Sequence, residues 1–300
     1  MLAVALPLFA FASTQAQSSA AKIAQSLLDA DRAFAASARS TDMISALSAM
    51  WSVGVMMPAP VSAAAPRGLL VGKAAVVAAI RATPDATTSQ VTWTPIRVGI
   101  SADGQHGFSF GFMTQRKPES TPVALKYMAY WVHEQGAWRV AAYKRSRAAG
   151  PPTDTTMMPP ALPTAITPTK RAAVGIAVLR RVVMDAESSF SAEAQRVGLG
   201  NAFATFGTTD AVNMGGEGSA SYVVSAASIA ALVSGGDMTA SRVHWGADTA
   251  LVASSGDLGI TFGLITSNTP PADGKPASGS AFFTIWRRVG ASATWRYVAE

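Results

Sequence analysis

The chain has 300 residues, of which 49% are hydrophobic and 14% are charged, and it contains no cysteine. This composition excludes a collagen, a coiled coil and a disordered tail, and the lack of cysteine excludes disulfides, iron–sulfur clusters, thiolate zinc sites and cysteine nucleophiles. The net charge of +6 lies in residues 1–156, which hold 14 Lys and Arg against 8 Asp and Glu. These basic residues are scattered and not interleaved with aromatic residues, so no nucleic-acid partner is predicted.

The N-terminal residues have the pattern of an export signal. Residues 2–12 form an uncharged apolar run that is too short to span a bilayer, and residues 14–16 resemble a signal-peptidase site. The sequence therefore predicts a signal peptide at 1–16 and a periplasmic or secreted location, although the basic residues that usually begin such a signal are missing. The alternative is a buried first helix. No later segment has 18 consecutive apolar residues, so no integral membrane segment is predicted.

Helices come first in the predicted order of elements. Ile23, Leu27 and Phe34 recur at helical spacing and predict a helix with one apolar face. Thr41 is a candidate N-cap for a second, short helix over 43–50.

Strands follow a third helix that is expected near 73–81. Apolar residues alternate along four segments and predict an antiparallel meander, at about 96–100, 108–112, 127–131 and 138–142. Helices followed by such a meander are typical of the α+β class.

The second half of the chain repeats the first at an offset of 152 to 157 residues. Residues 107–111 (GFSFG) align with 259–263 (GITFG). Six of the seven tryptophans pair in the same way, as Trp93 with Trp245, Trp131 with Trp286, and Trp138 with Trp295. An internal repeat of this length predicts two copies of one domain.

A proline-rich segment separates the two copies. Residues 148–169 hold six of the 17 prolines and a single charged residue, Asp154. Such a segment is extended and semi-rigid. We therefore predict domains at 17–147 and 170–300, joined by a linker at 148–169.

The second copy resembles a known superfamily. Residues 255–263 (SGDLGITFG) and 282–287 (FFTIWR), followed by Trp295-Arg296, are similar to the central hairpin of DUF4440 and SnoaL-like members of the nuclear transport factor 2-like (NTF2-like) superfamily. The resemblance implies two tandem cone-shaped α+β domains, each with N-terminal helices packed on a curved antiparallel sheet that encloses a pocket. Most relatives are homodimers that pack sheet on sheet, so a tandem chain implies an intramolecular pseudo-dimer.

The resemblance also implies a candidate acid–base group. Enzymatic relatives, such as ketosteroid isomerase and scytalone dehydratase, place a carboxyl group in an apolar pocket, where burial raises its pKa. Asp210 follows the second helix of copy two, and His244, beside Trp245, is a candidate proton shuttle. The structural alternatives are a turn or cap for Asp210 and a surface or core position for His244. Copy one has Gly54 and Thr92 at these places, so it is expected to lack the catalytic groups.

Large apolar side chains are the candidates for ligand contacts. The predicted lining is Trp51, Met57, Trp93, Phe110, Tyr222, Trp245 and Phe262. The matched tryptophans also suit a packing role, whereas Trp51 and Met57 have no apolar match in copy two and either line a pocket mouth or fill a gap in the core. The three histidines do not form a metal-binding pattern. No metal and no cofactor are predicted.

Three functions stay open at this point. The first is the binding of a small apolar or amphipathic molecule in a domain pocket. The second is a cofactor-independent isomerase, dehydratase or cyclase that uses Asp210 as general base, with His244 or Tyr222 assisting. The third is a structural interaction module of the cell envelope that uses a sheet face. The fold does not decide between them.

Overall fold

The computed structural model describes residues 9–59, 68–216, 218–269, 279–290 and 292–300, and only the backbone of residues 9–18. Half of the predicted signal peptide, residues 1–8, lies outside these residues, and the first helix runs without a break through residues 16 and 17. No helix in the described part of the chain is long and apolar enough to cross a bilayer.

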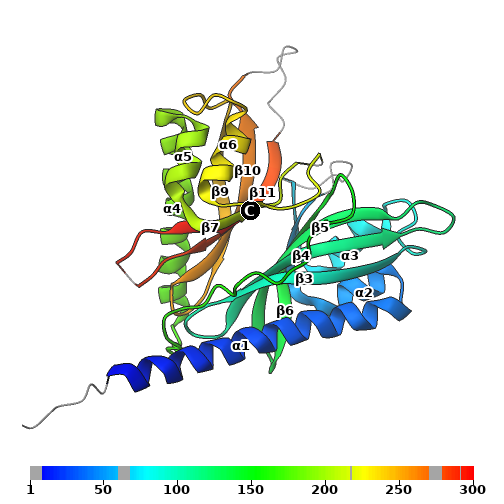
Figure 1. Ribbon diagram of the computed structural model, residues 1–300, viewed down its shortest axis with the longest axis horizontal. Coiled ribbons are helices and arrows are strands. Elements are labelled where there is room, and N and C mark those ends of the chain that lie inside the picture. Colours follow the sequence, from blue (N-terminus) through cyan, green and yellow to red (C-terminus); the bar gives the residue numbers. More distant parts are fainter. Residues whose placement is uncertain (1–8, 60–67, 217, 270–278, 291) are drawn as a thin grey trace, which may run out of the picture.

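Two α+β units follow one another along the chain (Figure 1), which confirms the predicted fold class. The first unit begins with helices and ends with a meander of long strands. Its elements are α1 (Phe9–Ser37), η1 (Ala38–Ser40), α2 (Met43–Met50), β1 (Trp51–Pro58), β2 (Leu69–Val71), α3 (Lys73–Arg81), β3 (Gln90–Ile100), β4 (His106–Arg116), β5 (Val123–Glu134) and β6 (Ala137–Arg147). The strands form one sheet in the order β2-β1-β6-β5-β4-β3.

The second unit repeats this plan. Its elements are α4 (Ala173–Val197), α5 (Leu199–Phe206), β7 (Gly207–Asn213), β8 (Val223–Val224), α6 (Ala226–Ser234), β9 (Val243–Val252), β10 (Leu258–Ser267), β11 (Gly279–Arg287) and β12 (Arg296–Ala299). The sheet order, β8-β7-β12-β11-β10-β9, is the same as in the first unit.

The strand register fixes which positions of the two units are equivalent. In the first unit Met56 lies opposite Ala142, and in the second Val212 lies opposite Ala299. These two pairs define offsets of 156 and 157 residues, close to the offset of the sequence repeat. The residue after Ala142, Tyr143, is therefore the counterpart of Glu300.

The second helix is capped one residue later than predicted. The carboxylate of Asp42, and not the hydroxyl of Thr41, accepts hydrogen bonds from the backbone N–H groups of Ile44 (2.9 Å) and Ser45 (3.1 Å). A carboxylate satisfies two otherwise unpaired donors of the first turn and also interacts favourably with the helix dipole.

The two sheets pack face to face, with the helices on their outer sides (Figure 1). Their inner faces share one apolar core, in which Phe108 and Phe110 of the first unit meet Phe262 and Phe283 of the second. All four side chains are fully buried. Each such burial stabilises the fold by roughly 1.5–3 kcal/mol, so the two units are held together mainly by apolar packing.

Polar contacts surround this shared core. Tyr222 of the second unit reaches into the first sheet, where its hydroxyl accepts a hydrogen bond from Gly111 N–H (3.2 Å) and donates to the carbonyl of Tyr127 (2.6 Å). In the other direction, the buried Lys126 donates to the carbonyl of Ser219 (2.7 Å). Each unit thus provides side-chain donors to the backbone of the other.

The segment between β6 and α4 runs along the outer edge of the first sheet. Met158 N–H donates to the carbonyl of Ile96 (2.7 Å), and Ala161 N–H donates to that of Val98 (2.9 Å). These bonds pair part of the β3 edge, which would otherwise present unsatisfied backbone groups.

Candidate functional site

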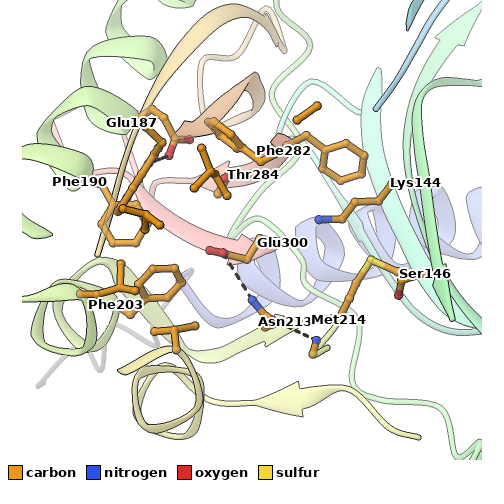
Figure 2. A pocket seen from close by; sticks show the side chains of 18 of the residues that line it. Lys144, Ser146, Glu187, Phe190, Phe203, Asn213, Met214, Phe282, Thr284 and Glu300 are labelled. Atoms are coloured by element: carbon orange, nitrogen blue, oxygen red, sulfur yellow. Dashed lines mark hydrogen bonds between the residues drawn. The ribbon is translucent and has the colours of Figure 1, made fainter. Parts of the chain in front are cut away.

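The second unit holds a cavity of about 400 Å³ between its helices and its sheet, and β6 of the first unit closes one side (Figure 2). We call it the second-unit cavity. It combines an aromatic wall with a small polar end. Its lining is Lys144, Arg145, Ser146, Glu187, Phe190, Leu199, Phe203, Asn213, Met214, Gly215, Val233, Val243, Trp245, Ile265, Ala281, Phe282, Phe283, Thr284 and Glu300.

The aromatic wall is built around Phe190 of α4. Its ring centroid lies 4.8 Å from that of Phe203 and 4.9 Å from that of Trp245, both in edge-to-face geometry. Phe206 stacks on Phe190 from behind at 4.9 Å. Such pairs fix one another's orientation and are worth about 0.5–1.5 kcal/mol each beyond burial. The wall is therefore rigid and preformed.

Glu187 also lines the cavity, beside this wall, and is fully buried. Its carboxylate accepts hydrogen bonds from the indole N–H groups of Trp245 (2.6 Å) and Trp286 (2.9 Å) and from the hydroxyl of Thr261. Burial raises the pKa of Glu187, and these hydrogen bonds oppose that rise. With three donors already bound, Glu187 holds the tryptophans in place.

The first unit uses the same device. Asp31, the counterpart of Glu187, accepts hydrogen bonds from Trp93 Nε1 (2.7 Å) and from the Tyr127 hydroxyl (2.9 Å), and it too is fully buried. This buried carboxylate with aromatic donors occurs in both units, although the cavity lies in the second unit. We therefore assign it a structural role in both units.

The polar end of the cavity is formed by Glu300, Asn213 and Lys144 (Figure 2). Asn213 Nδ2 lies 3.5 Å from Glu300 Oε2, at the limit of a hydrogen bond, while Glu300 Oε1 is buried and has no hydrogen-bond partner. Burial raises the pKa of Glu300 to about 8, although the charge of Lys144 opposes the rise. Burial also lowers the pKa of Lys144 to about 8, and the charge of Glu300 opposes that fall.

The equivalent space of the first unit is filled by its own side chains. Tyr143 stands where the second unit has Glu300, Met57 where it has Asn213, and Trp51 where it has Gly207. All three are buried in the first core, and the rings of Trp51 and Tyr143 lie 6.1 Å apart. The two units therefore share a fold but differ in the space that they enclose.

The two predicted catalytic residues lie apart and outside the lining of the second-unit cavity. Asp210 is on β7 and His244 is on β9, at separate places in the sheet order. Asp210 forms an ion pair with Arg97 of the first unit, and its side chain is 55% exposed. Partial burial acts to raise the pKa of Asp210, but the hydrogen bond and charge of Arg97 together lower it below the usual value. His244 is exposed, and its Nδ1 lies 2.7 Å from Asn268 Oδ1.

Of the predicted ligand contacts, Trp245 lines the second-unit cavity. Tyr222, Phe110 and Phe262 lie in the shared core between the sheets. Trp93, like Trp51 and Met57, lies in the core of the first unit. No group of three or more potential metal ligands occurs within the described ranges.

Sequence reasoning missed Glu300, Asn213 and Lys144. A signal was available in the repeat, because Glu300 and Asn213 replace the apolar Tyr143 and Met57 of the first unit. A polar residue at a position that is apolar in the sister copy indicates a cavity. Lys144 had no such signal, since it belongs to the first unit and faces a space in the second.

No protein-family model matches the chain, and no curated protein matches it. Solved structures do match, each over the length of about one unit. They include NTF2-like proteins and one assigned to the DUF3225 family.

Three of these structures illustrate the level of similarity. A ketosteroid isomerase-like protein from Erwinia carotovora atroseptica is 19% identical, with 40% of this chain and 95% of that chain covered and a TM-score of 0.30. An NTF2-like protein of unknown function from Shewanella oneidensis is 10% identical, with 41% and 97% covered and a TM-score of 0.32. An NTF2-like protein with a cystatin-like fold from Novosphingobium aromaticivorans is 15% identical, with 47% and 90% covered and a TM-score of 0.32.

Proposed function

We propose that this chain binds a small amphipathic molecule in the second-unit cavity. The observation that carries the proposal is the meeting of a preformed aromatic wall with a polar end in which Glu300 Oε1 is buried without a partner. Ligand sites are typically apolar cavities of about 300–1,000 Å³ with a few convergent polar groups, and a volume of about 400 Å³ fits that description. A buried oxygen without a partner costs free energy, which a ligand that forms a hydrogen bond with it would recover.

We also propose a supporting role for the first unit. The shared core and the contacts of Tyr222 and Lys126 support an intramolecular pseudo-dimer, in which the first unit is filled and supports the second. We further propose that both units belong to the DUF4440 and SnoaL-like branch, the second on its motifs at 255–263 and 282–287 and the first through the internal repeat. We further propose export, with cleavage after Ala16, for which the intact mass of the exported protein is the test.

A second candidate function is acid–base catalysis in the same cavity. It is favoured by the raised pKa of Glu300, about 8, which suits proton transfer near neutral pH. In this version Glu300, rather than the predicted Asp210, is the general base, because Asp210 is paired with Arg97. Nothing in the described residues favours the interaction module, since the inner face of each sheet is covered by the other.

The test is native mass spectrometry of the purified chain, with ligand retention compared between two variants. Asn213→Met introduces the side chain that the first unit has at this position and should fill the polar end. Thr205→Met adds a methionine at an exposed position of α5 and is the matched control. We expect a bound small molecule in the parent and in the control, and its loss in Asn213→Met. Equal retention by both variants would refute the cavity as the binding site.

A further inference from the structure

The second-unit cavity is composite, because its polar end is shared between the two units. Glu300 and Asn213 belong to the second unit, whereas Lys144, Arg145 and Ser146 come from β6 of the first. Figure 2 shows Lys144 reaching toward Glu300 from the side of the first unit. The first unit thus provides the cationic groups of a cavity whose walls belong to the second.

The residues that β6 contributes to this polar end have few hydrogen-bond partners. The Lys144 ammonium lies 4.5 Å from the ring centroid of Phe283, but it has no hydrogen-bond acceptor among the described residues and forms no ion pair with Glu300. Arg145 donates to the sulfur of Met43, a weak acceptor. Ser146 Oγ is buried and has no partner. Lys144 and Arg145 are half-buried, and a cation that is partly withdrawn from water is stabilised by a hydrogen-bonded anion or acceptor.

The acidic groups nearby do not supply that partner. Glu187 is bound to three donors of its own unit. Glu300 has one oxygen near Asn213 and the other free. When protonated, a carboxyl group can itself donate a hydrogen bond. The polar end therefore offers more donors than acceptors.

We propose that the ligand is an apolar molecule that ends in a carboxylate, and that Lys144 of the first unit and Glu300 of the second bind this carboxylate together. This inference rests on the proposed function of the cavity and adds the class of ligand. One carboxylate oxygen accepts from the Lys144 ammonium, and the other accepts from the protonated Glu300, while the apolar part lies against Phe190, Phe203 and Trp245. A charge-assisted bond of this kind is about twice as strong as a neutral one.

This arrangement makes binding depend on pH. Lys144 must be charged and Glu300 must be protonated, and the pKa of each group is about 8. The other charged or titratable groups that line the cavity are Arg145 and Glu187. Affinity for a carboxylate should therefore fall as the pH rises through about 8, because Lys144 loses its charge and Glu300 becomes an anion.

The test uses three probes with one apolar tail: 4-phenylbutanoate, 4-phenylbutanamide and 4-phenylbutylamine. Their dissociation constants for the full chain are measured by ligand-observed NMR and calorimetry at pH 7. We expect the carboxylate to bind tightest, by about tenfold, since a charged partner is worth more than a neutral one at this site. A preference for the amine, or equal binding of all three, would overturn the inference and leave the proposed function intact. Failure of all three to bind, with no molecule retained in native mass spectrometry, would refute both.

Two variants locate the effect. Lys144→Met keeps the length of the side chain. It should weaken the affinity for 4-phenylbutanoate by about tenfold and leave the affinity for 4-phenylbutanamide nearly unchanged. Lys22→Met, at an exposed position of α1, is the matched control and should change neither. Glu300→Gln keeps a hydrogen-bond donor, so it should still bind the carboxylate at pH 7 and lose less affinity at pH 9 than the parent does. Unchanged carboxylate binding in Lys144→Met, with the fold retained by circular dichroism, would overturn the assignment.

Discussion

Asp103 and Asp257 lie in equivalent hairpins of the two units, and each carboxylate accepts a backbone hydrogen bond from the other unit. Asp103 Oδ2 lies 3.0 Å from Ser255 N, and Asp257 Oδ2 lies 3.0 Å from Ala102 N. The two turns thus bond reciprocally at one end of the shared core. Asp257 stands where the first unit has Gln105.

Replacing Asp257 should loosen the contact between the units. Asp257→Ala leaves Ala102 N–H without its acceptor, which should lower the free energy of unfolding by about 1–3 kcal/mol. Urea denaturation followed by tryptophan fluorescence measures the loss. Asp185→Ala, at an exposed position of α4, is the control and should change stability by less than about 0.5 kcal/mol. Equal effects of the two substitutions would contradict a linking role for Asp257.

Tyr222 should contribute to stability through its hydroxyl. β3 is irregular near Pro95, which has no N–H, and the Tyr222 hydroxyl bonds to Gly111, opposite Pro95 on the neighbouring strand. Tyr222→Phe keeps the ring against Phe110 and Phe112 but removes these bonds, with an expected cost of about 1–3 kcal/mol.

The control for Tyr222 is Tyr297→Phe, which removes a hydroxyl that donates to Phe203 within the second unit. Both variants should unfold at lower denaturant concentration, but only Tyr222→Phe should separate the transitions of the two units. Hydrogen exchange of β4 and β5 would report this difference. Identical exchange patterns in the two variants would rule out a bridging role for the Tyr222 hydroxyl.

Lys144 and Glu300 should give the free chain a minimum of stability near pH 8. The pKa of Glu300 rises from an ordinary value of 4.5 to about 8 on folding, so the folded state binds more protons between these values and stability falls as the pH rises. The pKa of Lys144 falls from 10.5 to about 8, so the unfolded state binds more protons above pH 8 and stability rises again.

Single variants separate the fall in the free energy of unfolding below pH 8 from its rise above pH 8. Glu300→Gln should flatten the fall between about pH 5 and 8, and Lys144→Met should flatten the recovery above pH 8. Unfolding free energies from urea titrations across this range are the measurement. Profiles of both variants that run parallel to the parent would show that neither group titrates abnormally in the fold.

Glu187 should hold the aromatic wall in place. Glu187→Gln replaces one acceptor oxygen by an NH₂ group that faces the indole or hydroxyl donors, and should cost about 1–3 kcal/mol. Because burial raises the pKa of Glu187, its ionisation costs stability as the pH rises through that pKa, and the deficit of the variant should shrink at higher pH. Near-ultraviolet circular dichroism, to which Trp245 and Trp286 contribute among the seven tryptophans, is the measurement. An unchanged aromatic spectrum in the variant would contradict this role.

The repeat and the order of elements could be predicted from the sequence, because periodicity and paired tryptophans are local signals. Asp210 looked catalytic because it follows the second helix of copy two, where the resemblance implies an acid–base group, but its partner Arg97 lies 113 residues earlier in the other unit. Tyr222 looked like a lining residue because it is aromatic, but its hydroxyl bonds to the backbone of the first sheet. Lys144 could not be found at all, since its role depends on how the two sheets are packed. The residues of the candidate site thus depend on long-range contacts between the two copies, which the sequence does not show.

The hydrogen bonds of the linker to β3 have a further consequence for how the chain assembles. They shorten the free length of chain between the units and keep each second unit beside its own first unit. A short tether gives a high effective concentration for the intramolecular pairing, which disfavours exchange of units between two molecules. Ala161→Pro removes the backbone N–H that donates to Val98 and would favour domain-swapped species, in which Lys144 of one molecule faces the second-unit cavity of another.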